Sequence, residues 1–255
     1  MISADTARTA VGVLGNLIAL GLFLSPVPTF VRIMKKKSVE EFSAVPYLAT
    51  LVNCMLWVVY GLPLVHPHST LVLTINGSGL VIELTYVCLF IIFSTGKKRM
   101  KVLGIFVAEL VFVAAIFVLD VSMVRTHEKR SLVVGIFCVV FGTGMYVAPL
   151  SVMKMVIETK SVEYMPLSLS LASFFNAVCW TSYALIKFDL FITIPNGLGV
   201  LFAAVQLVLY AVFYKSTQKQ LEERKMKEMT RSVGLSEIIV DDNKADVGYP
   251  PKQRS

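Results

Sequence analysis

Seven apolar stretches, each long enough to cross a lipid bilayer, constrain the fold of this chain more than any other feature. Crossing the hydrocarbon core takes about 20 apolar residues, and lipid offers no partner for unpaired backbone N–H and C=O groups. Each stretch is therefore expected to be a helix, which pairs those groups internally. The stretches cover roughly residues 9–31, 43–63, 71–94, 102–124, 132–156, 166–187 and 190–214.

The composition agrees with an integral membrane protein. Hydrophobic residues make up 56% of the chain and charged residues 16%, with a mean hydropathy of +0.72. The net charge of +7 resides in short basic clusters between apolar stretches, which suits anionic lipid and not nucleic acid. The four cysteines lie inside apolar stretches without metal-ligand spacing, so we expect neither a metal nor a cofactor. The spans hold no histidine cluster, acid pair or Ser–Lys arrangement, so we do not expect an enzyme.

Basic residues gather on one side of the predicted bundle. They occupy the first, third and fifth connections and the segment after the last span, whereas the opposite side carries fewer, mainly within 125–130. Because cytoplasmic loops carry the excess of lysine and arginine, we expect the amino terminus outside and the carboxyl terminus in the cytosol. We expect a multi-pass protein of the plasma membrane. Residues 215–255 mix Glu, Lys, Asp and Ser and are predicted to be a disordered cytosolic tail.

Two regions of the chain are versions of one another. Ser38-Val39-Glu40 returns as Ser161-Val162-Glu163, and other pairs keep this spacing of 123 residues until a three-residue slip precedes Asn76-Gly77 and Asn196-Gly197. The repeat predicts a three-helix unit at 1–94, a linker helix within 95–131 and a second three-helix unit at 132–214. Equivalent helices lie four apart in the order, so both units run the same way through the membrane. The predicted fold is an all-α integral membrane bundle of seven helices arranged three-one-three.

Asparagines lie in matched positions deep inside the spans. Asn76 is the mate of Asn196, and Asn53 is the mate of Asn176. A buried amide is costly in lipid unless it finds a partner, and contact between helices is the simpler explanation. Matched amides that face each other across the repeat axis would instead offer donors and acceptors to a ligand with hydroxyl groups.

The only two tryptophans of the chain, Trp57 and Trp180, are also mates. Anchoring at the membrane interface is the usual role of tryptophan, but both lie well inside their spans. Two indole rings that flank a central cavity would sandwich the C–H face of a pyranose while amides bind its hydroxyls.

Prolines and acids add two further hypotheses. Because a proline inside a helix removes one backbone hydrogen bond, four prolines at one depth favour hinges of an inner gate. Acids within the spans are candidates for a proton relay, although none has an acidic mate in the other unit. The prolines are Pro26, Pro46, Pro149 and Pro166, and the acids are Glu83, Glu109 and Asp120.

These residues, in this order, resemble the SWEET sugar transporters, and most of all the plant members, over roughly residues 8–214. The resemblance implies a three-one-three bundle that carries sugar in both directions by facilitated diffusion and alternating access. The tail lies outside it. The motifs are Leu24-Ser25-Pro26-Val27-Pro28-Thr29-Phe30, Tyr60-Gly61-Leu62-Pro63, Thr74-Ile75-Asn76-Gly77, Ala148-Pro149-Leu150-Ser151, Lys160-Ser161-Val162-Glu163-Tyr164-Met165-Pro166 and Ile194-Pro195-Asn196-Gly197.

The resemblance also implies roles for individual residues. Asn76 and Asn196 would contact the sugar, and Trp57 and Trp180 would form the walls of its pocket. The four prolines would form the cytosolic gate, and Tyr60 with Asp189 would close the extracellular side. Bulky residues at pocket positions are similar to the hexose-preferring group, so we expect hexoses such as glucose, and a homo-oligomer. These positions are Leu22, Asn53, Met145 and Asn176.

Two alternatives remain at this point. A proton-coupled sugar symporter would use a membrane acid, and a heptahelical receptor would also have seven spans and an external amino terminus. Receptors of that kind lack a three-helix repeat, and the short first and third loops leave little room for a cytosolic partner.

Overall fold

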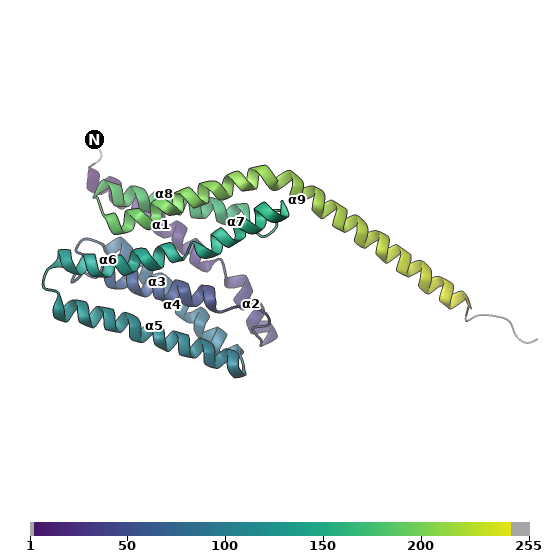
Figure 1. The fold of residues 1–255 in the computed structure, drawn as a ribbon, viewed down its shortest axis with the longest axis horizontal. Helices are drawn as coiled ribbons and strands as arrows, with labels where there is room; N and C mark the ends of the chain where they lie inside the picture. The colour runs from purple at the N-terminus through teal and green to yellow at the C-terminus, as the bar shows by residue number, and fades with distance from the viewer. Residues whose placement is uncertain (1–2, 246–255) are drawn as a thin grey trace, which may run out of the picture.

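The chain folds into a bundle of long helices, with no strand among its described residues (Figure 1). The computed structural model describes residues 3–245, and side chains are described for residues 3–231. The helices are α1 (Ala4–Leu24), α2 (Val27–Lys36), α3 (Val45–Gly61), α4 (Thr70–Phe93), α5 (Gly96–Met123), α6 (His127–Gly144), α7 (Val147–Thr159), α8 (Leu167–Ile186) and α9 (Leu190–Ala245).

Seven spans can be recognised in the described part of the chain. Six have the length and apolar composition to cross a membrane, with α1 and α2 together forming one of them and α6 and α7 another. The shorter apolar helix α3 is the seventh. The predicted all-α fold with three helices, a linker and three helices is confirmed.

The first span of each unit is broken at an equivalent place. α1 gives way to α2 at Pro26, and α6 gives way to α7 just before Pro149. A proline lacks the backbone N–H and clashes with the preceding turn, which accounts for both interruptions. α2 and α7 then end on the mates Lys37 and Lys160, both in the left-handed conformation with φ of 51° and 55°. The repeat of the sequence is therefore also a repeat of backbone geometry.

The two units meet through a pair of equivalent contacts. α1 packs on α8, and α6, the counterpart of α1, packs on α3. Within each unit the third helix packs on the other two, α4 on α1 and α3, and α9 on α6 and α8. The linker helix α5 packs on α3, α4 and α6 at the side of the bundle (Figure 1). Two helices from each unit thus form the interface between the halves.

The repeated Asn-Gly-x-Gly motif allows the third helix of each unit to approach the broken first span. A Cβ atom at Gly79 would lie 2.5 Å from the Phe23 ring and 2.9 Å from Cys54 Sγ. A Cβ at its mate, Gly199, would collide with the Tyr146 hydroxyl. The first glycine of the motif differs, because a Cβ at Gly77 would meet nothing within 4 Å.

The prediction of a disordered tail is wrong over residues 215–245, which continue α9 away from the bundle (Figure 1). The prediction rested on composition, which does not show the contacts between the first turns of this extension and the loop after α7. Thr217 Oγ1 accepts from the backbone N–H of Val162 at 2.8 Å, and Arg224 pairs with Glu163. Because the transmembrane part already supplies the helix nucleus, extension costs little for residues such as Lys and Glu. Residues 246–255 of the predicted tail lie outside the described residues.

Gly79→Ala should lower the melting temperature of the purified protein in detergent by several degrees, because overpacking a tight contact costs about 1–3 kcal/mol. Gly77→Ala is the matched control, since the added methyl group meets open space and alanine favours a helix. Thermal unfolding of both variants checks this. Equal melting temperatures would show that the contact between Gly79 and Phe23 is not tight.

Candidate functional site

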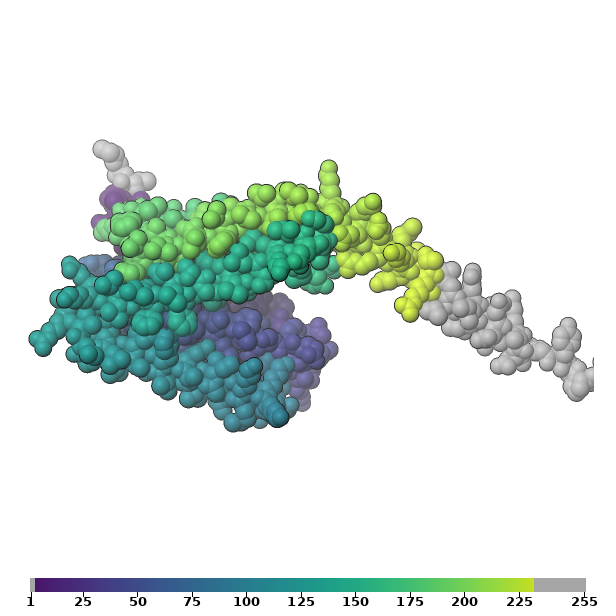
Figure 2. Space-filling model, viewed as in Figure 1, coloured from purple at the N-terminus to yellow at the C-terminus, as the bar shows by residue number. Residues whose placement is uncertain are grey.

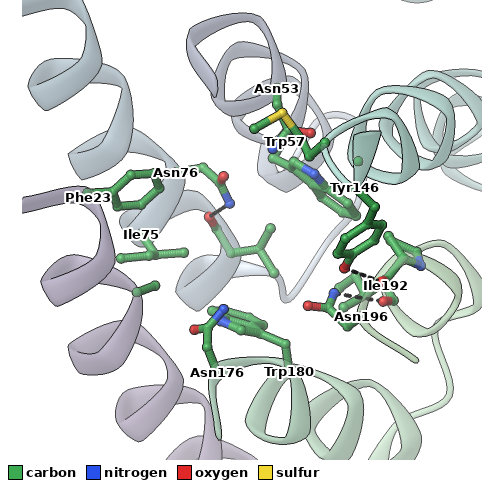
Figure 3. Close-up of a pocket in the computed structure, with 15 residues that line it drawn as sticks. Phe23, Asn53, Trp57, Ile75, Asn76, Tyr146, Asn176, Trp180, Ile192 and Asn196 are labelled. Atoms are coloured by element: carbon green, nitrogen blue, oxygen red, sulfur yellow. Dashed lines mark hydrogen bonds between the residues drawn. The ribbon is translucent and has the colours of Figure 1, made fainter. Parts of the chain in front are cut away.

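A cavity of about 220 Å³ lies between the two halves, inside the membrane-spanning bundle. It takes residues from α1, α3 and α4 of the first unit and from α6, the α6–α7 break, α8 and α9 of the second (Figure 3). Every lining residue is uncharged. They are Ala19, Phe23, Asn53, Trp57, Val72, Ile75, Asn76, Gly142, Met145, Tyr146, Asn176, Trp180, Ile192, Pro195 and Asn196.

The lining reproduces the sequence repeat. Every lining residue except Met145 has its repeat mate in the same lining. Seven of the eight predicted pocket residues therefore lie around one cavity, although they come from helices far apart in the sequence. The pairs are Ala19 and Gly142, Phe23 and Tyr146, Asn53 and Asn176, Trp57 and Trp180, Val72 and Ile192, Ile75 and Pro195, and Asn76 and Asn196.

Leu22, the mate of Met145, is the predicted pocket residue that is missing from the lining. The two broken spans explain the difference. Met145 follows the last residue of α6 and lies in the break, whereas Leu22 is still inside α1. On that helix Ala19 and Phe23, four residues apart, share the face that borders the cavity, and Leu22 is rotated away from it.

The asparagine side chains on the third helix of each unit make equivalent hydrogen bonds to the backbone. Asn76 Nδ2 donates to the carbonyl of Val72, and Asn196 Nδ2 donates to the carbonyl of Ile192, both at 2.9 Å. Each bond uses one of the two N–H groups, so the side-chain oxygen and the second N–H of each amide have no partner within the helix. Figure 3 shows the two amides on opposite sides of the cavity.

A second pair of amides, Asn53 and Asn176, completes the polar lining. Their Oδ1 atoms are buried, and neither has a hydrogen-bond partner. A buried oxygen without a partner costs free energy comparable to a lost hydrogen bond. Both residues line the cavity, so a ligand that supplies hydroxyl groups could pair with these amides.

The two tryptophans form opposite walls of the cavity (Figure 3). Trp57 and Trp180 are each only 7% exposed, which is too little for an anchor at the membrane surface. Each ring meets a tyrosine of its own helix edge to face, Trp57 with Tyr60 at 5.4 Å and Trp180 with Tyr183 at 5.3 Å between ring centroids. These contacts fix the orientation of both indole rings.

Sequence reasoning missed the aromatic pair Phe23 and Tyr146, which line the cavity beside the two breaks. The Tyr146 hydroxyl donates to the carbonyl of Pro195 at 2.6 Å. In the other half the Tyr86 hydroxyl donates to the carbonyl of Phe23 at 3.0 Å. One tyrosine thus fastens each break to the third helix of its own unit. The repeat spacing was the signal available, since Phe23 and Tyr146 are both aromatic and 123 residues apart.

One end of the cavity is closed by a contact between the halves. The Tyr60 hydroxyl, at the end of α3, donates to Asp189 with oxygen–oxygen distances of 3.1 and 3.0 Å. Asp189 also caps α9, because its Oδ1 accepts from the N–H groups of Phe191 and Ile192. Nearby, Lys187 pairs with Asp5 and joins the end of α8 to the start of α1.

His66 belongs to this closed end and was not predicted. Its ring stacks on Tyr60 at 4.7 Å, and its Nε2 lies 3.3 Å from Asp189 Oδ2. Its Nδ1 lies 2.8 Å from the Ser131 hydroxyl of α6. Burial lowers the pKa of the His66 imidazole, whereas the Asp189 carboxylate opposes that shift. The histidine thus ties the loop after α3 to two helices of the other half.

At the opposite end the halves diverge. α2 packs on α4 and α7 packs on α9, each within its own unit, and Figure 2 shows a notch between the halves at this end. The four predicted gate prolines all lie here and none is buried. Pro46 lies in the first turn of α3 and Pro166 precedes α8, where a proline disturbs no helical hydrogen bond. The expected kinks therefore occur only at Pro26 and Pro149.

The membrane acids lie away from the cavity, since none of the three is part of its lining. Glu83 and Asp120 are buried at 3% and 2% exposure. Glu109 borders a separate, apolar cavity of about 630 Å³ between α3, α5 and the α6–α7 break.

The chain matches known proteins along most of its length. Residues 9–98 and 132–218 match the family described as "Sugar efflux transporter for intercellular exchange". The bidirectional sugar transporter SWEET4 of Oryza sativa subsp. indica is 65% identical over 244 residues, which are 96% of this chain and 94% of the relative. The bidirectional sugar transporter SWEET7 of Arabidopsis thaliana is 55% identical, over 91% of this chain and 90% of the relative.

The fold also matches a solved structure. A structure of a eukaryotic SWEET transporter superposes with a TM-score of 0.80 at 42% identity, covering 83% of this chain and 99% of that chain. The two matched segments of the family cover most of the two three-helix units and leave out all but the first turn of the linker helix α5. The chain therefore belongs to the SWEET family of sugar transporters.

Proposed function

We propose that the chain is a bidirectional, facilitative sugar transporter that prefers hexoses such as glucose and works by alternating access. The observation that carries this proposal is the set of paired amides and tryptophans around one cavity between the two halves. The names of its relatives support the direction and the substrate class. Membership of a transporter family argues against the receptor.

The chemistry of the lining suits a pyranose ring. The rings of Trp57 and Trp180 can pack against the C–H groups of the sugar on both faces. Hydroxyl groups can donate to the amide oxygens of Asn76 and Asn196, which have no partner in the protein. Because the cavity lies inside the membrane-spanning bundle, a sugar hydrogen bond to these half-buried amides is worth more than a bond at the surface of the protein.

The size of the cavity favours one ring. Its volume of about 220 Å³ is below the roughly 300–1,000 Å³ that is typical of pockets for drug-sized ligands. The side chains of Asn53, Met145 and Asn176 take up part of the space. A disaccharide would have to displace them, which supports hexoses over sucrose.

The positions of the acids support uniport over proton coupling. A symporter that couples through a group next to the bound sugar needs a titrating side chain in the lining, and the lining of the cavity carries no charge. Glu83, Glu109 and Asp120 all lie outside it.

We place the Tyr60 end of the bundle outside the cell and the proline end in the cytosol, because Arg32, Lys97 and Lys154 accompany the proline end. The described conformation would then be closed outside and open inside. Transport in either direction requires the Tyr60–Asp189 contact to break while the proline ends approach each other. The family description, which refers to intercellular exchange, supports the plasma membrane. We also propose a homo-oligomer, which native mass spectrometry can measure.

Asn76→Ala and Asn196→Ala should each reduce glucose uptake about tenfold or more at normal surface abundance, because a buried sugar hydroxyl loses its partner. Uptake of labelled glucose in cells without their own hexose transporters measures this. Asn16→Ala is the matched control, since this membrane amide donates to Thr74 and does not line the cavity. If the cavity variants take up glucose as Asn16→Ala does, the amides are not part of the site.

Pocket size can be tested separately. Replacing Asn53, Met145 and Asn176 by Ser, Val and Ser should raise sucrose uptake relative to glucose uptake, because the cavity becomes larger. Leu22→Val is the control, since Leu22 does not line the cavity, and it should leave the ratio unchanged. An equal ratio in the triple variant and the control would exclude cavity volume as the determinant.

Proteoliposomes with an imposed proton gradient test the transport mode. With a non-metabolised glucose analogue, a uniporter brings the internal and external concentrations to the same value whether or not the gradient is present. Glu83→Gln should reach the same end point. Accumulation above the external concentration, abolished by a protonophore, would contradict uniport.

A further inference from the structure

The polar side chains of the cavity follow the two-fold relation of the repeat, whereas a hexopyranose does not. Asn76 faces Asn196 and Trp57 faces Trp180 across the cavity (Figure 3). A pyranose carries its ring oxygen and its hydroxymethyl group on one side only. If the pyranose ring turned by 180° about the repeat axis, it would contact the same kinds of side chains, an amide and an indole on each side. The paired residues therefore cannot distinguish the ring oxygen from the ring carbon opposite it.

Only unmatched residues could recognise the ring oxygen. The one polar difference between mates is the hydroxyl of Tyr146, which Phe23 lacks. That hydroxyl donates to the Pro195 carbonyl at 2.6 Å and points at α9, so its proton is not offered to the cavity (Figure 3). Met145, whose mate lies outside the lining, carries no strong donor.

Hydroxyl groups, in contrast, are needed by the site. The Oδ1 atoms of Asn53 and Asn176 have no partner, and those of Asn76 and Asn196 receive no bond within their helices. A site built to bind hydroxyls rejects an analogue that lacks them, because its buried polar groups then remain unpaired. The site thus selects a ring that carries hydroxyls all round, and it is indifferent to which ring atom is oxygen.

We propose that the transporter also carries cyclitols, the cyclohexane polyols of which the inositols are the fully hydroxylated members. This inference rests on the proposed sugar transport and extends its substrate class. A cyclohexane hexol has about the bulk of a hexopyranose, has apolar C–H faces for the two tryptophans and offers a hydroxyl at every ring carbon. The fit requires neither a ring oxygen nor a hydroxymethyl group.

Counterflow into proteoliposomes that hold the full chain and are preloaded with glucose tests the proposal. The probes are 5a-carba-glucose, in which only the ring oxygen is replaced by CH₂, and scyllo-inositol, in which all hydroxyls are equatorial. Both should inhibit the entry of labelled glucose at concentrations within about tenfold of glucose itself, the effect of losing at most one ordinary hydrogen bond. trans-1,4-Cyclohexanediol, with the same ring and few hydroxyls, should inhibit far less.

Labelled scyllo-inositol should also enter the vesicles, and Asn196→Ala should abolish its entry together with that of glucose. Entry of glucose without inhibition by either probe at a hundredfold excess would overturn the proposal, because the site would then recognise the ring oxygen. Failure of the wild-type protein to move glucose at all would instead overturn the proposed sugar transport, and the extension with it.

Discussion

The requirement that buried amides find partners inside a membrane governs the centre of this molecule. Lipid supplies neither donors nor acceptors, so Asn53, Asn76, Asn176 and Asn196 are tolerable only where another polar group can reach them. The parallel repeat brings all four to the interface between the halves, and it brings both tryptophans to the same place. The cavity therefore lies where two copies of one motif meet, and the buried Oδ1 atoms of Asn53 and Asn176 in its lining have no partner in the protein.

Equivalent contacts within each half hold the broken first span against the third helix of the same unit. Tyr86 fastens the first break to α4 and Tyr146 fastens the second break to α9, while Gly79 and Gly199 keep the same helices in close contact. Between the halves, the hydrogen bonds and ion pairs gather at the Tyr60 end. Two rigid halves that are bonded to each other at one end have the geometry that a rocking motion of one half against the other requires.

The sequence predicted the fold and most of the cavity lining because both depend on patterns that can be read along the chain, namely the length of apolar stretches and the spacing of repeated residues. Apolar length predicted the spans, and the internal repeat paired Trp57 with Trp180 and, after its three-residue slip, Asn76 with Asn196. Leu22 was misplaced because spacing does not reveal where a helix breaks relative to its mate. His66 was missed because a histidine in a short loop carries no periodic signal. The helical tail was missed because composition does not show contacts such as the hydrogen bond between Thr217 and Val162.

Intrinsic fluorescence tests most directly that the cavity between the halves binds sugar. The chain has two tryptophans and both line the cavity, so every tryptophan signal reports on the site. Titrating the purified protein with glucose should give a saturable change in emission. Trp57→Phe and Trp180→Phe, which each leave one reporter, should both retain a change, and Asn196→Ala should lose it. An emission spectrum that does not respond to glucose in the wild-type protein, while transport of glucose is intact, would contradict a sugar site between Trp57 and Trp180.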